Sequence, residues 1–293
     1  MLLVILMVKK AFLLILFSLP PTVYGAAGGV SLTAEVAFML GDLPVTNSMI
    51  TSWVISLLII LVIRALSGKT SLIPNRGQLF VESIVGSIRV ILEPIVGKKV
   101  FFASFWLLSG LFIFILINNW SGLLPGVGTI GSGYYDENNH FVIENSFIRP
   151  GNADLNMTFA LAAVANLCWL YFIFKFEGLK NIAIHIFGNK ADKKEVGIYV
   201  FIGLIQLFFA VGLIEIVSIL FRPVSLTFRL FGNVFGGESL LHSMFYLVPE
   251  LAWILPLPFY FMEVLIGFVQ ALVFMLLIAV YIGLMCNHGD EHH

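Results

Sequence analysis

The sequence predicts an all-α integral membrane protein with about five transmembrane helices, and three observations support this fold class. Of its 293 residues, 59% are hydrophobic and only 11% are charged, whereas soluble domains carry about 25% charged residues. Several apolar stretches reach the roughly 20 residues that a helix needs to cross a bilayer. The connections between these stretches alternate between basic and acidic composition, which the positive-inside rule associates with alternating sides of a membrane.

The first 26 residues have the composition of a secretory signal. Two lysines precede an apolar run, 11–19, which is followed by Pro20, Pro21 and a group of small residues. This order of regions is typical of a signal peptide that is removed after export. The alternative is an uncleaved extra N-terminal helix. In both cases we expect the following segment to be external and residues 27–286 to form a single membrane domain.

The distribution of charge assigns the remaining segments to sides of the membrane. The connection from Arg64 to Lys99 is mostly basic, which places it in the cytoplasm. Apolar residues recur at helical spacing within it, so 76–97 is predicted as an amphipathic helix on the inner membrane surface. The short tail 287–293 is also predicted to be cytoplasmic. The predicted membrane helices are 48–63, 100–124, 157–174, 197–248 and 251–285.

The last two of these segments are longer than a bilayer requires. As a helix, 197–248 would extend about 78 Å, whereas a span of roughly 20 residues is sufficient. Division into two ordinary spans would need polar turns midway, and the sequence contains none there. Pro223 is compatible with a kinked helix. We therefore favour a long, steeply tilted hairpin formed by 197–248 and 251–285.

Polar and small residues line one side of the first long helix, and we call this row the polar seam. Its members follow one another at alternating steps of three and four residues: Glu215, Ser218, Arg222, Ser225, Arg229, Gly232 and Gly236. Asn233 lies beside the seam. A charge at bilayer depth costs roughly 2.5–3.5 kcal/mol, so it is expected to face protein or a water-filled cavity. A purely structural seam, in which Glu215 pairs with Arg222, is the alternative.

Two carboxylates and a glutamine lie away from the seam. Glu238 is nine residues beyond Arg229, about half a turn away around the helix. Glu263 and Gln270 share a face of the last helix because they are seven residues apart. Antiparallel packing would bring Glu238 and Glu263 into one polar cavity, which His242 could join. Buried carboxyl groups can pass protons near neutral pH, so the sequence favours a proton relay over a plain hydrogen-bonded pair.

The stretch from Pro223 to Glu238, PVSLTFRLFGNVFGGE, closely resembles the signature of subunit a of the F-type ATP synthases. Further matches are ADLNMT at 153–158, the segment 118–125, and QALVFM at 270–275. The resemblance extends in order from about Thr46 to the end of the chain. It identifies the chain as a member of the family of stator subunits that lie beside the rotor ring.

The resemblance implies roles for individual residues. Arg229 matches the essential arginine, which stands between two offset aqueous half-channels and interacts with the carboxylate of each passing rotor subunit. The other residues implied in proton translocation are Glu238, Glu263 and Gln270 for the external half-channel, Asn233 near the arginine, and Glu215 and Ser218 for the internal half-channel. Supporting positions are Arg222, Ser225, Gly232, Gly236, His242 and Asp154.

The resemblance also implies the surroundings of the protein. We expect it in a bacterial plasma (inner) membrane, in contact with c-ring rotor subunits, peripheral-stalk b subunits, other ATP synthase subunits and lipid. It would have no catalytic site of its own and no cofactor. No phosphate-binding glycine loop occurs in the sequence, and the formal net charge of −1 gives no reason to expect nucleic-acid binding.

Two other classes of protein fit the composition. A self-contained ion-coupled secondary transporter would account for the intramembrane charges, but such proteins usually contain internal repeats with paired broken helices. The sequence contains no second copy of the region around Arg229. A membrane scaffold would use the polar seam only as an assembly contact.

Overall fold

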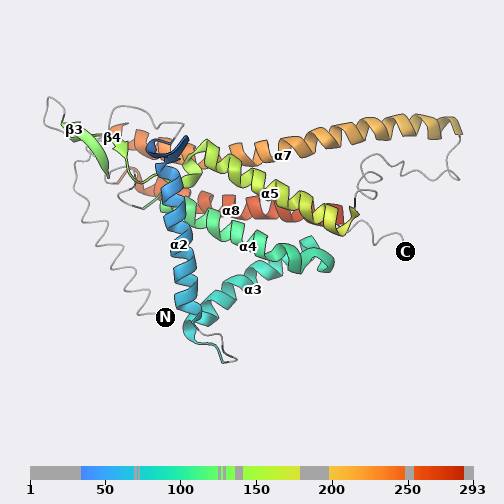
Figure 1. Cartoon of the computed structure of the whole chain (residues 1–293), viewed down its shortest axis with the longest axis horizontal. Coiled ribbons are helices and arrows are strands. Elements are labelled where there is room, and N and C mark those ends of the chain that lie inside the picture. Colours follow the sequence, from blue (N-terminus) through green and yellow to red (C-terminus); the bar gives the residue numbers. More distant parts are fainter. Residues whose placement is uncertain are drawn as a thin grey trace. The chain divides into compact units, whose positions relative to one another are not determined.

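A computed structural model describes residues 34–68, 71, 73–124, 127, 130–135, 141–178, 198–247 and 254–286. Helices dominate this part of the chain (Figure 1). The predicted signal-like segment and the predicted cytoplasmic tail, 287–293, lie outside the described residues.

Five of the helices are long and apolar enough to cross a membrane, which confirms the predicted fold class. Their bounds are α2 Asn47–Ser67, α4 Lys98–Ser121, α5 Leu155–Phe176, α7 Ile198–Leu247 and α8 Leu257–Cys286. Within α7 the candidate span is Gln206–Leu241. A bilayer offers no water to the main-chain N–H and C=O groups of these apolar segments. The helix satisfies them with hydrogen bonds inside the segment.

The helix ends differ from the predicted ones by a few residues. The first predicted span stops at Ile63, yet α2 continues through Arg64 to Ser67. Arg64 is compatible with the last turns of α2 because its side-chain stem is apolar and its positive charge interacts favourably with the helix C-terminus. The last predicted segment starts at 251, and residues 251–253 lie outside the described residues. Residues 254–256 form a turn, and α8 begins at Leu257.

Helix α7 is one continuous helix of 50 residues (Figure 1, orange). It has Pro223 in its interior, where the missing N–H removes one intrahelical hydrogen bond. The hydroxyl of Thr227 donates to the Pro223 carbonyl at 2.7 Å, one turn further along. The single long helix that the sequence favoured over two shorter spans is therefore present, with a length of about 75 Å.

The amphipathic segment forms α3, Arg76–Val96. Its N-cap is Asn75, whose side-chain oxygen accepts a hydrogen bond from the Gln78 main-chain N–H at 2.7 Å. Its C-cap is Gly97 with φ 80°, a conformation that favours glycine. One side of the helix is buried, including Leu92 and Val96, and the remainder is largely exposed. This is the distribution that an amphipathic helix requires.

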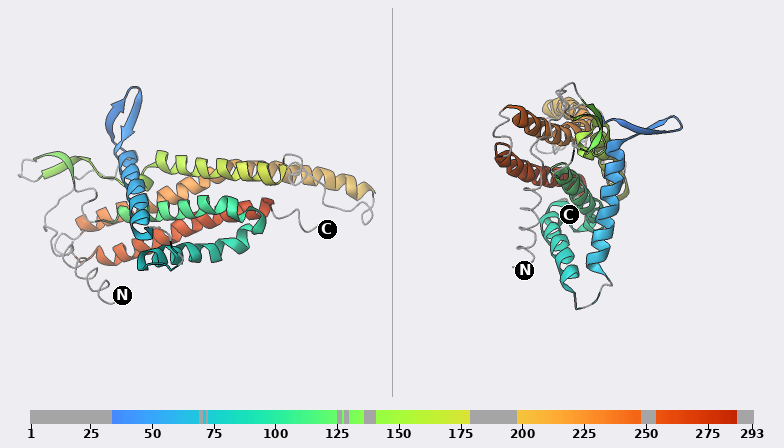
Figure 2. Two further views of the ribbon diagram at one scale, coloured as in Figure 1. Left: turned by 60° about the horizontal axis from the view of Figure 1, so that its bottom comes forward. Right: turned by 90° about the vertical axis from the view of Figure 1, so that its left-hand side faces the viewer.

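Two small antiparallel hairpins were not predicted from the sequence. The first pairs β1 (Val36–Leu40) with β2 (Leu43–Thr46), and Figure 2 shows it as the blue arrows. The second pairs β3 (Gly131–Tyr135) with β4 (Phe141–Ser146). All five β1 side chains are exposed, so no buried face imposes the alternating pattern by which strands are recognised. A short 3-10 helix, η1 (Gly151–Ala153), precedes α5.

The chain divides into two compact units, which we describe separately. Unit 1 contains the chain up to Ile55, Leu116–Asp154 and Gly232–Phe268. Unit 2 contains Ser56–Ile115, Leu155–Phe231 and the chain from Val269 onward. The core of unit 2 is apolar and includes the fully buried side chains of Leu92, Leu108 and Phe274.

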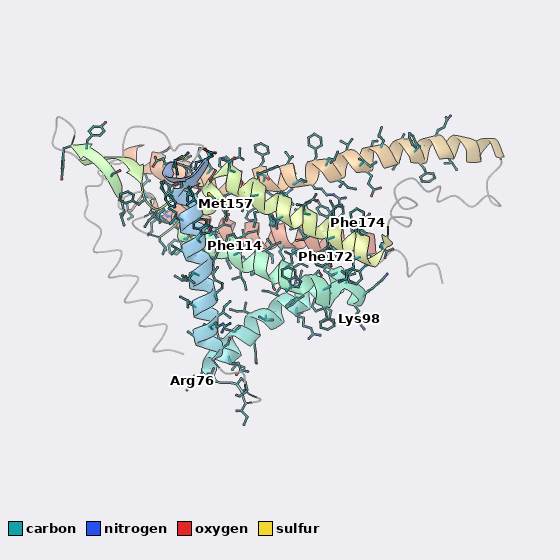
Figure 3. All side chains as sticks on the ribbon, in the orientation of Figure 1. Arg76, Lys98, Phe114, Met157, Phe172 and Phe174 are labelled. Carbon is teal, nitrogen blue, oxygen red and sulfur yellow. The ribbon has the colours of Figure 1, made fainter. Side chains whose placement is uncertain are left out.

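Helix α5 has one side buried in unit 2 and one side exposed. Phe172 is only 3% exposed, whereas Phe174, two residues later, is 49% exposed (Figure 3). Such large exposed apolar side chains are compatible with lipid as the surrounding solvent, because lipid tails are as apolar as the side chains themselves.

Candidate functional site

Five of the seven residues of the polar seam are exposed among the described residues, whereas Glu215 and Arg222 are partly buried. Ser218, Ser225 and Arg229 are exposed, as are both seam glycines. The opposite side of the helix is buried through Leu226, Leu230, Val234 and Leu241. A Cβ added at Gly232 or Gly236 would meet no atom of the described residues within 4 Å. Around these two glycines the seam is therefore not covered by any described residue.

Arg229 is exposed in the middle of this strip, inside the candidate span Gln206–Leu241. Its neighbour Phe228 is also exposed, by 60%. A permanent charge at this depth is too costly to leave in lipid, so its exposed side chain requires water or a protein partner.

Arg222, two helical turns before Arg229, has different surroundings within unit 2. Its guanidinium carbon lies 4.8 Å from the ring centroid of Trp169 on α5 and 4.2 Å from that of Tyr281 on α8. Glu215 also interacts with it electrostatically. The structural alternative for the seam requires an ion pair between Glu215 and Arg222, and these two described side chains form none. The aromatic partners were not predicted, because they come from distant parts of the sequence.

The carboxyl group of Glu263 packs against Gly237, the residue that precedes Glu238 on α7. A Cβ added at Gly237 would collide with the carboxyl group of Glu263, so that carboxyl group lies directly against the α7 main chain next to Glu238. Oε2 of Glu238 is buried and accepts no hydrogen bond from the residues that the structure describes. α7 and α8 thus pack closely next to Glu238 in this unit, and a polar cavity shared by Glu238 and Glu263 stays a prediction.

Arg149 lies in unit 1 with Glu238 and Glu263 and was not predicted as a site residue. It precedes η1, is only 8% exposed, and donates a hydrogen bond from Nη2 to the Ala153 carbonyl at 3.1 Å. It also interacts electrostatically with Glu238. One feature of the sequence could have indicated its importance: Arg149 is the only Lys or Arg in the otherwise acidic connection 125–156.

A buried polar network in unit 1 supports the same part of α8. Asn119, at the end of α4, donates from Nδ2 to the Gly267 carbonyl at 2.9 Å and accepts from Asn152 at 2.7 Å. A separate buried hydrogen bond in the same unit involves α2, where Ser48 donates to Asp154 at 2.8 Å. Asn119 is thus bonded to the turn of α8 between Glu263 and Gln270. Asp154 was predicted as a supporting residue, whereas Asn119 and Asn152 were not.

The remaining predicted residues differ in their surroundings. Gln270 is 4% exposed and belongs to the core of unit 2, whereas Asn233 is exposed on α7. His242 belongs to α7, but its side chain lies outside the described residues. Among the residues that the structure describes, no three His, Cys, Asp or Glu side chains gather as a metal site would require.

Replacing Gly237 with alanine is expected to displace the carboxyl group of Glu263 while the helices remain paired. The new methyl group would occupy the position of that carboxyl group, which is the mobile end of a flexible side chain. We expect labelling of Glu263 by a hydrophobic carbodiimide, measured by mass spectrometry of the labelled peptide, to rise several-fold. The matched control is Gly236→Ala, whose methyl group meets none of the described atoms. Equal labelling of Glu263 in both variants would contradict this packing.

The fold and the site together define a class of protein. Five apolar helices, two of which carry acidic or basic side chains well within their spans, make a multi-pass helical membrane protein with intramembrane charged residues. The family model described as ATP synthase A chain matches residues 49–283. The chain therefore belongs to the ATP synthase A chain family, whose members work as membrane subunits of a multi-subunit complex.

Curated relatives agree with this assignment. The chain is 29% identical to ATP synthase subunit a of Gloeobacter violaceus over 265 residues, which cover 90% of this chain and 94% of the relative. It is 30% identical to that of Moorella thermoacetica over 246 residues, covering 84% and 93%. It is 33% identical to that of Geotalea daltonii over 231 residues, covering 78% and 82%.

Proposed function

We propose that this protein is the proton-translocating stator subunit of an F-type ATP synthase membrane sector. It provides two offset half-channels and the arginine, Arg229, that together couple ion flow to rotation of a c-ring. The observation that carries the proposal is the exposed part of the polar seam of α7, where a permanent cation, Arg229, precedes two glycines at which an added Cβ would meet no described atom within 4 Å. Glycines on an intramembrane helix allow another helix to approach closely.

The electrostatics of Arg229 support its role as a barrier. Arginine keeps its proton under nearly all conditions, so it does not relay protons itself. Its fixed positive charge attracts the ionised carboxylate of an approaching rotor subunit and repels a proton that moves directly from one half-channel to the other. The ion is therefore forced to travel on the ring. One elementary charge that crosses 100 mV releases about 2.3 kcal/mol, which is the source of energy for rotation.

The other polar residues are assigned to the two half-channels. Glu238, Glu263 and Gln270 belong to the external half-channel, and the contact of Glu263 with Gly237 supports a shared path for the two carboxylates. Asn233 lies near the arginine. Glu215 and Ser218 belong to the internal half-channel, where Glu215 also compensates the charge of Arg222.

The proposal includes an orientation in a bacterial inner membrane. The N-terminus is external after processing and the C-terminus is cytoplasmic, because the connection between α2 and α4 carries most of its charge as lysine and arginine. Peripheral-stalk b subunits, other ATP synthase subunits and lipid are the further neighbours of the protein.

Disulfide formation between the seam and the rotor tests this proposal. We expect the variant Gly232→Cys to form a disulfide with a cysteine placed beside the rotor carboxylate, because Gly232 is open and three residues from Arg229. The cross-link should stop ATP-driven proton pumping in inverted vesicles, and reduction should restore pumping.

The control is Val234→Cys, because Val234 is only 9% exposed and packs against its own chain. It should neither cross-link to the rotor nor respond to oxidation. The proposal is rejected by a Gly232→Cys variant that assembles but forms no rotor cross-link, or by one that cross-links and continues to pump.

A further inference from the structure

The two arginines of the polar seam are partnered in different ways. Arg229 is exposed on α7, whereas Arg222 is half-buried in unit 2 between aromatic rings of two other helices. Helical geometry places residues seven apart on nearly the same side, about 20° short of two full turns and about 10.5 Å apart along the axis. The side chain of Arg222 therefore fixes the same face of the helix from which Arg229 projects.

The contact at Arg222 is a double cation–π interaction. Its guanidinium carbon is 4.8 Å from the Trp169 ring centroid and 4.2 Å from that of Tyr281, both well inside the limit of about 6 Å for such contacts. Trp169 is only 2% exposed, so one of the two rings is held firmly by the core. The planar guanidinium can stack on ring faces, which the compact ammonium group of lysine cannot do.

Hydrogen bonding does not account for the position of this guanidinium. Nη1 of Arg222 is buried and donates to none of the residues that the structure describes. The ring faces of Trp169 and Tyr281 take the place of hydrogen-bond acceptors on that side. The contact thus depends on Arg222 lying between α5 and α8, and it would be lost if α7 turned by a single residue, which is about 100°.

We propose that Arg222 is a positioning residue that fixes the rotation of α7, through the rings of Trp169 and Tyr281, so that Arg229 faces the rotor. This inference rests on the proposed function, because it assigns to Arg229 the role of ion barrier. In this account Arg222 takes no part in ion transfer. Its effect on coupling acts entirely through the direction in which Arg229 points.

The test compares Arg222→Gln with Arg222→Lys in the assembled complex in inverted vesicles. Because a misplacement of about 1 Å can cost up to ~100-fold in a positioned reaction, we expect Arg222→Gln to lower proton pumping per ATP hydrolysed by about tenfold. Passive proton leak per assembled complex, measured after removal of the catalytic head, should rise. A merely destabilising change would reduce the amount of complex without raising the leak of each one. Arg222→Lys, which keeps the cation but loses the planar stack, should fall between the native protein and Arg222→Gln.

Two variants at Tyr281 provide a second test that remains informative if the Arg222→Gln variant does not fold. Tyr281→Leu removes the ring face and should reproduce the loss of coupling and the increased leak. Tyr281→Phe keeps the ring and should retain most of the coupling. The charge control is Arg89→Gln, in which an exposed arginine of α3 is replaced and leak should remain native.

The reference variant Arg229→Ala separates the two proposals. If Arg229→Ala loses coupling while Arg222→Gln and Tyr281→Leu keep native coupling and leak, the positioning role of Arg222 is wrong and the proposed function stands. If Arg229→Ala itself keeps native pumping, the proposed function fails.

Discussion

Replacing Arg229 with alanine is expected to abolish ATP-driven proton pumping while the complex remains assembled. Two unit charges 4 Å apart interact by about 4 kcal/mol at an effective dielectric constant of 20, which corresponds to ~1000-fold in an equilibrium constant. In the proposed mechanism, the rotor carboxyl group beside α7 then keeps its proton, because no nearby cation stabilises its ionised form. Because Arg229 is exposed on its own chain, its truncation leaves the core unchanged. Pumping is measured by fluorescence quenching of a pH-sensitive dye in inverted vesicles.

Arg229→Lys distinguishes a barrier from a simple attraction. Lysine carries the same charge but can lose its proton in apolar surroundings, so it can pass protons where arginine does not. We expect this variant to pump poorly and to leak protons passively when the catalytic head is removed. Native pumping by an assembled Arg229→Ala complex would show that the permanent charge is dispensable, and the proposed mechanism would have to be abandoned.

Replacing Gly283 with alanine is expected to cause a large loss of stability in unit 2. A Cβ at this position of α8 would collide with the main-chain carbonyl oxygen of Ile95 on α3. A main-chain atom cannot move aside as the end of a side chain can, so α3 and α8 must separate. Overpacking of this kind typically costs about 1–3 kcal/mol. The measurement is the apparent Tm of the detergent-solubilised protein, together with the yield of assembled complex.

Gly110→Ala provides the control for this prediction. An added Cβ at Gly110, on α4, meets none of the described atoms within 4 Å. Alanine is favoured over glycine inside a helix by roughly 1 kcal/mol, so this variant should be as stable as the native protein or more stable. Equal Tm values for Gly283→Ala and Gly110→Ala would contradict the close approach of α3 and α8.

Much of the fold could be predicted from the sequence because the bilayer imposes a simple rule. A long apolar segment in hydrocarbon has to be helical, so α7 was expected as one helix despite Pro223, and it is. The two hairpins could not be predicted in this way. Their strands are short, β1 buries none of its side chains, and β3 consists of glycine, serine and tyrosine, so neither carries an alternating apolar pattern.

The candidate site was predictable to the extent that it follows one helix. The three-and-four spacing placed Arg222, Arg229 and Gly232 on one side of α7, and both Arg229 and Gly232 lie on the exposed side. Contacts between distant segments were beyond such reasoning. Periodicity within α7 carries no information about Trp169 or Tyr281, which hold Arg222. The buried network around Asn119 depends in the same way on three-dimensional proximity rather than spacing.

The length of α7 has a consequence for the route of the ion. Its 36-residue candidate span is about 54 Å long, nearly twice the ~30 Å thickness of the hydrocarbon layer. If that span stays within hydrocarbon, it must lean about 55° from the bilayer normal, and its ends reach opposite surfaces about 45 Å apart sideways. In the proposed mechanism, ions that enter beside one end of α7 and leave beside the other therefore have to move laterally in the membrane plane. Rotation of a ring of subunits beside the helix would provide this lateral movement, whereas a straight pore along the bilayer normal would not.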